Sequence, residues 1–386
     1  MVSMGFSAVP TPLYVLYQQR DHFSTFMITV VYAVYAVGVV ASLFLGGHIS
    51  DWVGRKRVLV PALLVNVISA VIFILAPSLP GLLIARTING VSVGLTTATA
   101  TAYLAELHAG TSAGEAVRSP RRAQVVATAA NLGGIGLGPL AAGLLAQFAP
   151  QPLRLPYILF GIALVVLAVL VALAPETTRW PDPAPAWRPQ RIAVPRHARP
   201  VFFAATAAGF ASFAVYGVIN SLAPSFLAGT LHDISEAVAG TVAFAAFAAG
   251  ALAQIGMGRA GLRLTLRVSV LLLLPGLALL AGGMWLPSLA MFVIGAAVTG
   301  AGGGLVFRGA LTAAGGTASP ESRAEVIAGF FLGAYVGVSV PVVGLGIATL
   351  YAPARAVMLV FVVLVAVAIA ASVRAVMGAA ASVTST

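Results

Sequence analysis

Long apolar stretches follow one another along almost the whole chain, and they constrain its fold more than any other feature. We count twelve, at about residues 1–19, 26–46, 58–77, 80–104, 122–146, 155–174, 201–228, 236–257, 265–285, 288–310, 325–348 and 354–374. Each approaches the roughly 20 residues that a helix needs to cross a membrane. Only 8% of the residues are charged, against about 25% in soluble domains. The sequence therefore predicts an all-α integral membrane protein with about twelve transmembrane helices.

The basic residues predict the orientation. An even number of spans puts both termini on one side, and most of the 21 Lys and Arg residues then fall in loops on that same side. Arg20, Arg154 and Arg355 fall on the other side, while Arg86 and Arg308 lie within spans. Because cytoplasmic loops are enriched in basic residues, we expect both termini in the cytoplasm. The excess of arginine and alanine is typical of a GC-rich bacterial genome, so we predict a multi-pass protein of a bacterial cytoplasmic membrane.

Several kinds of chemistry are disfavoured by the residue types. The net charge of +11 follows from the loop pattern and does not indicate nucleic-acid binding. The chain has no cysteine, which excludes disulfides and thiolate sites. Its five histidines lie in loops or at span ends with no metal-pair spacing, and no nucleophile–base or paired-acid group lies within the spans. We therefore expect no metal, no cofactor and no enzymatic activity.

The first span is unusual, because it contains Pro10 and Pro12 and no basic segment precedes it. It does not have the positive leader of a signal peptide. We expect the native start to lie upstream, so that part of this helix is missing. N-terminal sequencing of the native protein tests this expectation.

The loop between the second and third spans carries the pattern G-x-x-x-D-x-x-G-R-K, formed by Gly47, Asp51, Gly54, Arg55 and Lys56. Gly47 is expected to let two helix ends approach closely, and Gly54 to supply a turn that other residues make only under strain. The basic residues hold the loop in the cytoplasm. The Asp51 carboxylate has two candidate partners: the neighbouring Arg55, or the positive N-terminal end of another helix.

This loop resembles the signature loop between helices 2 and 3 of the major facilitator superfamily of secondary transporters. The resemblance implies two six-helix bundles around a central cavity, with access alternating between the two sides of the membrane. It also implies that Asp51 docks at the N-terminus of the eleventh helix, near Ser319 and Pro320, and so locks one conformation. The alternative interpretation is an ordinary basic loop.

Span 4 contains Arg86, three residues before Asn89. Arg86 lies roughly 10 Å inside the span, where a charge costs several kcal/mol unless it faces a wet cavity or a partner. The arrangement resembles the second motif of the same family, in which glutamine usually stands at the Asn89 position. We therefore predict that Arg86 and Asn89 line a substrate cavity. An arginine that snorkels to the membrane surface is the alternative.

Span 5 contains the run Gly134-x-x-x-Gly138-Pro139-x-x-Ala142-Gly143. Small residues four apart allow close helix packing, which is the simplest interpretation of this run. The full pattern also resembles the third family motif, which is found in antiporters that export drugs or metabolites. That resemblance is the main reason to predict export.

The chain divides into two halves. Residues 1–175 are predicted to form the N-terminal six helices, and 201–377 the C-terminal six, followed by a tail at 378–386. Residues 176–200 are rich in proline and arginine and are predicted to be a cytoplasmic linker. In the cavity between the halves, Tyr14 and the polar stripe with Tyr216 and Asn220 are further candidates for substrate contact or charge relay.

None of the acidic residues falls in the middle of a span. Proton-coupled transporters commonly use a buried carboxylate, and Asp21, at the outer end of the first span, is the nearest candidate proton site. A cation in a dry cavity needs an acid, so Arg86 favours a small neutral or anionic organic substrate. We predict a monomeric proton-coupled exporter in the lipid bilayer. The alternatives are an uptake symporter for a sugar or organic acid, and a non-transporting sensor or defective copy.

Overall fold

The computed structural model describes residues 1–110, 125–177, 194–230, 235–318 and 322–383, and all regular structure in these ranges is helical. The N-terminal half contains α1 (Val2–Ala8), α2 (Pro10–Asp21), α3 (Thr25–Gly46), α4 (Ser50–Val53), α5 (Arg55–Leu75), α6 (Leu79–Gly110), the π-helical turn η2 (Ala129–Gly133), α8 (Gly134–Phe148) and α9 (Leu155–Leu173). The C-terminal half contains η3 (Arg196–Ala198), α10 (Arg199–Thr230), α11 (Glu236–Gly256), α12 (Leu262–Trp285), α13 (Leu289–Gly315), α14 (Arg323–Ala348) and α15 (Ala354–Val383).

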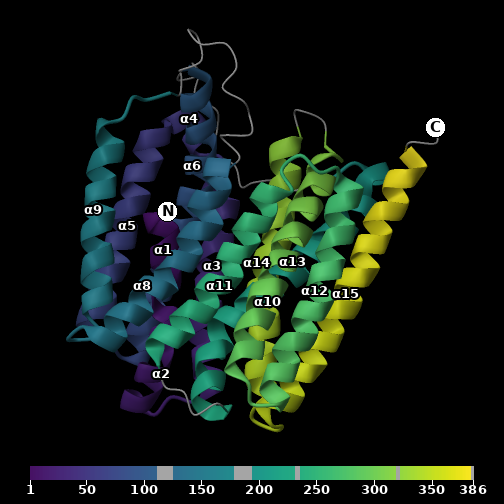
Figure 1. Ribbon diagram of the computed structural model, residues 1–386. Helices are drawn as coiled ribbons and strands as arrows, with labels where there is room; N and C mark the ends of the chain where they lie inside the picture. The colour runs from purple at the N-terminus through teal and green to yellow at the C-terminus, as the bar shows by residue number, and fades with distance from the viewer. Residues whose placement is uncertain (111–124, 178–193, 231–234, 319–321, 384–386) are drawn as a thin grey trace.

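Figure 1 shows two helical bundles that stand side by side. In the first, α6 packs against α3 and α5, and α1 packs against α8. In the second, α13 packs against α11 and α12, and α10 packs against α14. The bundles meet where α8 contacts α11 and where α3 contacts α14. This architecture confirms the predicted all-α membrane fold of two helical halves.

Ten helices in the described part of the chain are long and apolar enough to cross a membrane. The other two predicted spans are α6, which has the required length but carries Arg86, Asn89 and several threonines, and the α1–α2 pair. The first span is not one continuous helix, because α1 ends before Val9 and α2 begins at Pro10. Pro10 and Pro12 lack the backbone N–H that would continue the helical ladder, which explains the break.

Several helices extend beyond their predicted ends. Helix α15 continues to Val383, so most of the predicted tail is helical, and α6 continues to Gly110. Helix α10 begins at Arg199, inside the segment predicted as linker. The central part of that linker, 178–193, lies outside the described residues, as do Ser319 and Pro320 before α14.

Glycines bring α3 and α6 into close contact. A Cβ atom on Gly90 would lie 2.0 Å from the Tyr35 carbonyl oxygen, and one on Gly38 would lie 2.3 Å from that of Thr87. Neither position has room for a side chain, so the two backbones touch there. This contact places the middle of α3 beside Arg86 of α6, and it therefore builds one wall of the site described next.

Candidate functional site

Arg86 lies at the centre of the N-terminal bundle and is only 1% exposed. Its Nη1 donates to the Ser7 carbonyl oxygen at 2.7 Å. Its guanidinium carbon lies 4.9 Å from the ring centre of Tyr35 and 5.5 Å from that of Tyr32. Aromatic faces attract cations, and no described carboxylate pairs with Arg86. The charge is therefore held by neutral groups, and its Nε has no partner among the described residues.

Two of the predicted contact residues adjoin this centre. The Tyr14 hydroxyl lies beside the Arg86 guanidinium, close enough for the two groups to interact. Asn220 of α10 lies beside the Tyr32 hydroxyl, so it connects the C-terminal bundle to the same group of side chains. Arg86, Tyr14 and Asn220 thus come together as predicted, although their roles stay predictions.

Asn89 and Tyr216 form hydrogen bonds to neighbouring helices. The Asn89 amide donates to Asn66 of α5 at 2.7 Å, which ties two helices of the same bundle together. The Tyr216 hydroxyl donates to the Gly300 carbonyl oxygen at 2.7 Å, and its ring stacks on Phe247. Both side chains join neighbouring helices in this conformation. Their predicted contacts with substrate stay predictions that this geometry disfavours. Helical spacing alone does not distinguish a cavity face from a helix–helix face.

Two tyrosines of this centre were not among the sequence candidates. Tyr32 and Tyr35 stand three residues apart on α3, and both contact Arg86. Tyr335 of α14 lies within reach of Thr97 on α6, across the two bundles. Two tyrosines on one face of a long apolar span were the available signal. Recognising their role also requires knowing that α3 packs against α6.

A second group of charges lies at the end of the molecule that carries α4 (Figure 1). The Arg55 guanidinium pairs with Glu106 of α6 at 2.6 Å and with Asp51 at 2.5 Å, and it also donates to Ser50. The hydrogen bonds from Arg55 hold the pKa of the Glu106 carboxyl below its ordinary value, against the opposing effect of burial. The loop is thereby joined to the end of α6.

Glu176 fixes the same loop from the end of the N-terminal half. Its carboxylate accepts from the backbone N–H groups of Arg55 and Lys56 at 3.0 and 3.1 Å. These are the first N–H groups of α5, which have no partner within the helix. Gly54 precedes them with φ +113°, a backbone conformation that favours glycine. The turn predicted for Gly54 is therefore confirmed.

Two details of the loop differ from the sequence expectations. Asp51 pairs with Arg55, and its carboxylate is 58% exposed, so the local alternative describes this conformation. Its predicted docking place begins at Ser319, outside the described residues, and the lock stays a prediction. The three atoms nearest to a Cβ on Gly47 all belong to Leu43 of the preceding turn, so the tightest contact at Gly47 is within its own segment and not with another helix. That approach occurs instead at Gly38 and Gly90.

The glycine run of α8 packs against both bundles. A Cβ on Gly138 would lie 1.9 Å from the Gly5 carbonyl oxygen of α1, and one on Gly134 would lie 2.8 Å from that of Met1. On the side of the C-terminal bundle, a Cβ on Gly143 would lie 2.2 Å from the Glu236 carbonyl oxygen. A Cβ on Gly240 of α11 would likewise lie 2.3 Å from the Pro139 carbonyl oxygen. The run is thus a close-packing surface at the junction of the two bundles.

Asp21 lies at the opposite end of the molecule, where it pairs with Arg20 at 2.5 Å. The hydrogen bonds from Arg20 lower the pKa of the Asp21 carboxyl, against the opposing effect of burial. A proton carrier must take up its proton near the working pH, and a lowered pKa works against that. The role of Asp21 as a proton site stays a prediction that this geometry disfavours.

Two helical bundles, with ten helices in the described part of the chain long and apolar enough to cross a membrane, define an integral membrane protein. The family model described as the major facilitator superfamily matches residues 1–232. The chain belongs to the major facilitator superfamily and is a transporter. No curated protein sequence matches it.

Solved structures of the same fold include two transporters. A variant of the nucleoside transporter NupG superposes with a TM-score of 0.71 at 14% identity, covering 96% of this chain and 97% of the other. The human organic anion transporter MFSD10 (TETRAN) superposes with a TM-score of 0.66 at 18% identity, covering 95% of each chain. At these identities the likeness extends to the fold and not to the substrate.

Proposed function

We propose that this transporter exports a small neutral or anionic organic compound by alternating access of its two bundles. The observation that carries the substrate class is Arg86, a buried cation held by tyrosine faces and a carbonyl oxygen without a described carboxylate. A buried charge is costly unless something compensates it. An anionic group, or an electron-rich neutral one, is the chemistry that compensates Arg86 best.

The similar structures support this substrate class in a limited way. One is titled a nucleoside transporter and the other an organic anion transporter. Those substrates belong to those proteins, and a compound of either kind would suit the positive charge of Arg86 in the proposal made here. A lipophilic cation would instead add a second positive charge beside Arg86.

The proposed direction is export coupled to protons, across a bacterial cytoplasmic membrane, by a monomer with both termini inside. Support for export comes from the Gly134–Gly143 run of α8, which resembles the antiporter motif and lies where the two bundles meet. Uptake by symport is the competing proposal. Oriented vesicles distinguish the two: substrate accumulation in inside-out vesicles on acidification of the lumen supports export, and accumulation in right-side-out vesicles supports uptake.

The loop with Asp51 and Arg55 is proposed to act as a lock that alternates between two states. In the conformation seen here Asp51 pairs with Arg55, and in the other it would dock on the start of α14. Asp51→Asn should slow transport while leaving expression and membrane insertion unchanged. Glu325 is an acid in the first turn of α14, where Asp51 would dock. Glu325→Gln therefore tests the α14 side of the proposed contact. Full transport by the Asp51→Asn variant would refute the lock.

The substrate class is tested by ligand-induced stabilisation of the purified protein in detergent, with panels of neutral, anionic and cationic organic compounds. A ligand at 100 times its dissociation constant adds about 2.7 kcal/mol, which is a clear shift in Tm. Hits in the neutral or anionic panel support the proposal. Hits confined to the cationic panel overturn it. No stabilisation in any panel counts against binding of a small organic compound at Arg86.

A further inference from the structure

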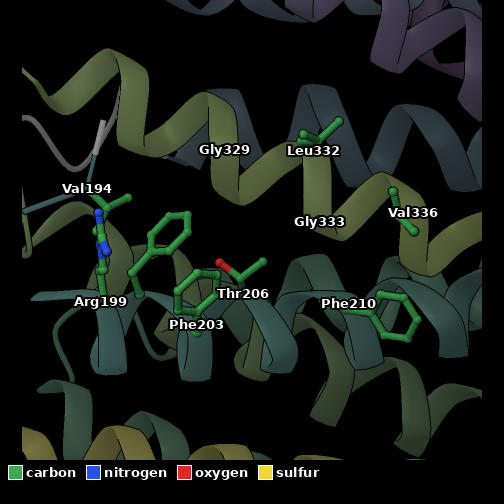
Figure 2. Close-up of a pocket in the computed structure, with 10 residues that line it drawn as sticks. Val194, Arg199, Phe203, Thr206, Phe210, Gly329, Leu332, Gly333 and Val336 are labelled. Atoms are coloured by element: carbon green, nitrogen blue, oxygen red, sulfur yellow. The ribbon is translucent and has the colours of Figure 1, made fainter. Parts of the chain in front are cut away.

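An apolar groove of about 480 Å³ lies between α10 and α14, away from the arginine centre. Figure 2 shows Arg199, Phe203, Thr206 and Phe210 along α10, facing Gly329, Leu332, Gly333 and Val336 of α14. Val194 and Arg199 stand at one end of the groove, where α10 begins.

Small residues bring α10 and α14 close together beside the groove. A Cβ on Gly337 would lie 2.2 Å from the Phe210 carbonyl oxygen, so the two helices touch at that level. A Cβ on Gly333, one turn nearer the start of α14, would lie 2.2 Å from Thr206 Cγ2, so the Thr206 methyl group packs against this glycine. The open space of the groove is bounded by the apolar side chains of Phe203, Leu332 and Val336.

The groove faces outward and not into the centre of the molecule. Phe331 and Tyr335 of α14 join the aromatic contacts with Phe213 on the inner side. At 100° per residue, Gly333 and Val336 lie about 140–200° around the helix from Phe331. Phe203 is 64% exposed and Val336 39% exposed. In a membrane these surfaces contact lipid.

The polar groups of the groove fit a phospholipid. Arg199 is exposed at the end of the groove where the preceding linker joins α10, with Arg196 exposed just before it. Basic residues at a membrane surface attract anionic headgroups. Thr206 lies about 10 Å deeper along the helix, and its hydroxyl is buried without a partner among the described residues. That hydroxyl is free to donate to an ester carbonyl oxygen, beyond which the walls are apolar.

We infer that this groove binds one anionic phospholipid, with its phosphate at Arg199 and one acyl chain between α10 and α14. The acyl chain lies in the groove bounded by Phe203, Leu332 and Val336. The site is distinct from the arginine centre and does not depend on the proposed transport function. Lipid binding at this site makes the stability of the contact between α10 and α14 depend on the lipid composition of the membrane.

The test uses native mass spectrometry and thermal unfolding of the full chain in detergent, with phosphatidylglycerol or phosphatidylcholine of identical acyl chains. Wild type should retain one phosphatidylglycerol with a preference of about fivefold, as one arginine near a membrane surface predicts. Phosphatidylglycerol should also raise Tm more than phosphatidylcholine does. Arg199→Gln should abolish the preference, and Leu332→Trp, which fills the groove, should abolish retention of both lipids.

Two substitutions serve as matched controls. Arg267→Gln removes an exposed arginine near the start of α12, and Leu271→Trp enlarges a lipid-exposed side chain that lies as deep in α12 as Leu332 does in α14. Both should bind lipid as wild type does. Equal losses in the controls would show general lipid association and overturn the site. Unchanged retention in Leu332→Trp, or no retained lipid in wild type, would overturn it as well.

Discussion

Two arginines of the N-terminal half are compensated in opposite ways. Arg55 is fully paired, with two carboxylates and a hydroxyl around it. Arg86 is more deeply buried, yet it relies on tyrosine faces and a single carbonyl oxygen. Removing a carboxylate from a fully paired arginine leaves an uncompensated charge in the protein. An arginine that has no carboxylate partner can still bind an additional negatively charged group. Arg55 is thus suited to holding structure, and Arg86 to binding.

Arg86→Gln tests the binding role directly. The amide keeps hydrogen-bonding capacity but loses the positive charge, so affinity for an anionic ligand should fall about tenfold to a hundredfold, as expected for a charge-assisted hydrogen bond. The measurement is the ligand concentration that gives half of the maximal Tm shift. Arg154→Gln, at an exposed position, is the control and should bind as wild type does. Unchanged affinity in Arg86→Gln would remove Arg86 from the substrate site.

The Glu106–Arg55 pair predicts a pH dependence of stability. The pKa of Glu106 is lowered in the folded protein from its ordinary value of 4.5. A lowered pKa means that the pair stabilises the fold above about pH 4.5 and that this contribution is lost as the pH falls through the folded-state value. Glu106→Gln should therefore lower Tm at pH 7 and should lose less Tm than wild type on acidification.

Thermal unfolding in detergent from pH 7 to about pH 3, below the ordinary glutamate pKa of 4.5, measures this effect. Glu236→Gln is the control, since the described residues give Glu236 no ion pair, and its Tm should fall on acidification as that of wild type does. If Glu106→Gln kept the full acid sensitivity of wild type, the pair would not contribute to stability.

At the scale of elements, glycines decide which helices touch and where. Gly38 and Gly90 bring α3 against α6, and Gly138 brings α8 against α1. In lipid there is little hydrophobic force between helices, so close backbone contact is a main source of their association. The contact between α3 and α6 places the Tyr35 ring next to Arg86. Gly54 has a different role: its positive φ allows the chain to turn before α5, and it does not mediate contact between helices.

Gly54→Ala should destabilise the start of α5. An alanine at φ +113° is strained by about 1–3 kcal/mol, and its Cβ would lie 2.9 Å from a Glu176 carboxylate oxygen. We expect a lower Tm for this variant in detergent. Gly256→Ala should leave Tm unchanged, because among the described residues no atom outside its own stretch of helix lies within 4 Å of the new Cβ, and its φ is not unusual. Equal Tm values for the two variants would contradict the argument.

At the scale of the whole molecule, the two bundles are joined at the end that carries α2. Ser225 of α10 donates to Gln18 of α2 at 3.2 Å, and α2 packs against both α10 and α11. Nearby, Gly346 of α14 packs on Thr29 of α3. Alternating access requires that one end of the molecule opens while the other is closed. These contacts close the α2 end in the conformation seen here.

A crosslink across the α2 end should therefore block transport. The chain contains no cysteine, so Gln18→Cys with Ser225→Cys introduces a single reactive pair. Treatment with a short bifunctional thiol reagent should abolish substrate flux in proteoliposomes, and a reducible reagent should allow recovery. Each single-cysteine variant is the control and should keep its flux after treatment. Undiminished flux in the crosslinked double variant would mean that this end does not need to open.

Much of the fold was accessible from the sequence because membrane spans are encoded locally. A helix that crosses lipid must satisfy its own backbone and present apolar side chains, so length and composition alone predicted the helices. The turn at Gly54 was equally local. Pro10 and Pro12 marked the first span as unusual, and the structure has a helix break at Val9. Helices α10 and α15 are longer than the spans predicted for them.

The roles of individual polar residues were decided only by tertiary structure. Arg86, Tyr14 and Asn220 were correctly grouped, but Asn89 and Tyr216 bond to neighbouring helices. All of these residues lie on faces with the same helical spacing, and the spacing does not say which helix lies opposite. The sequence by itself determined a membrane-spanning helical chain with its charged loops. Only the packing of one helix on another decided which buried polar groups meet a partner and which, like Arg86, remain available for a ligand.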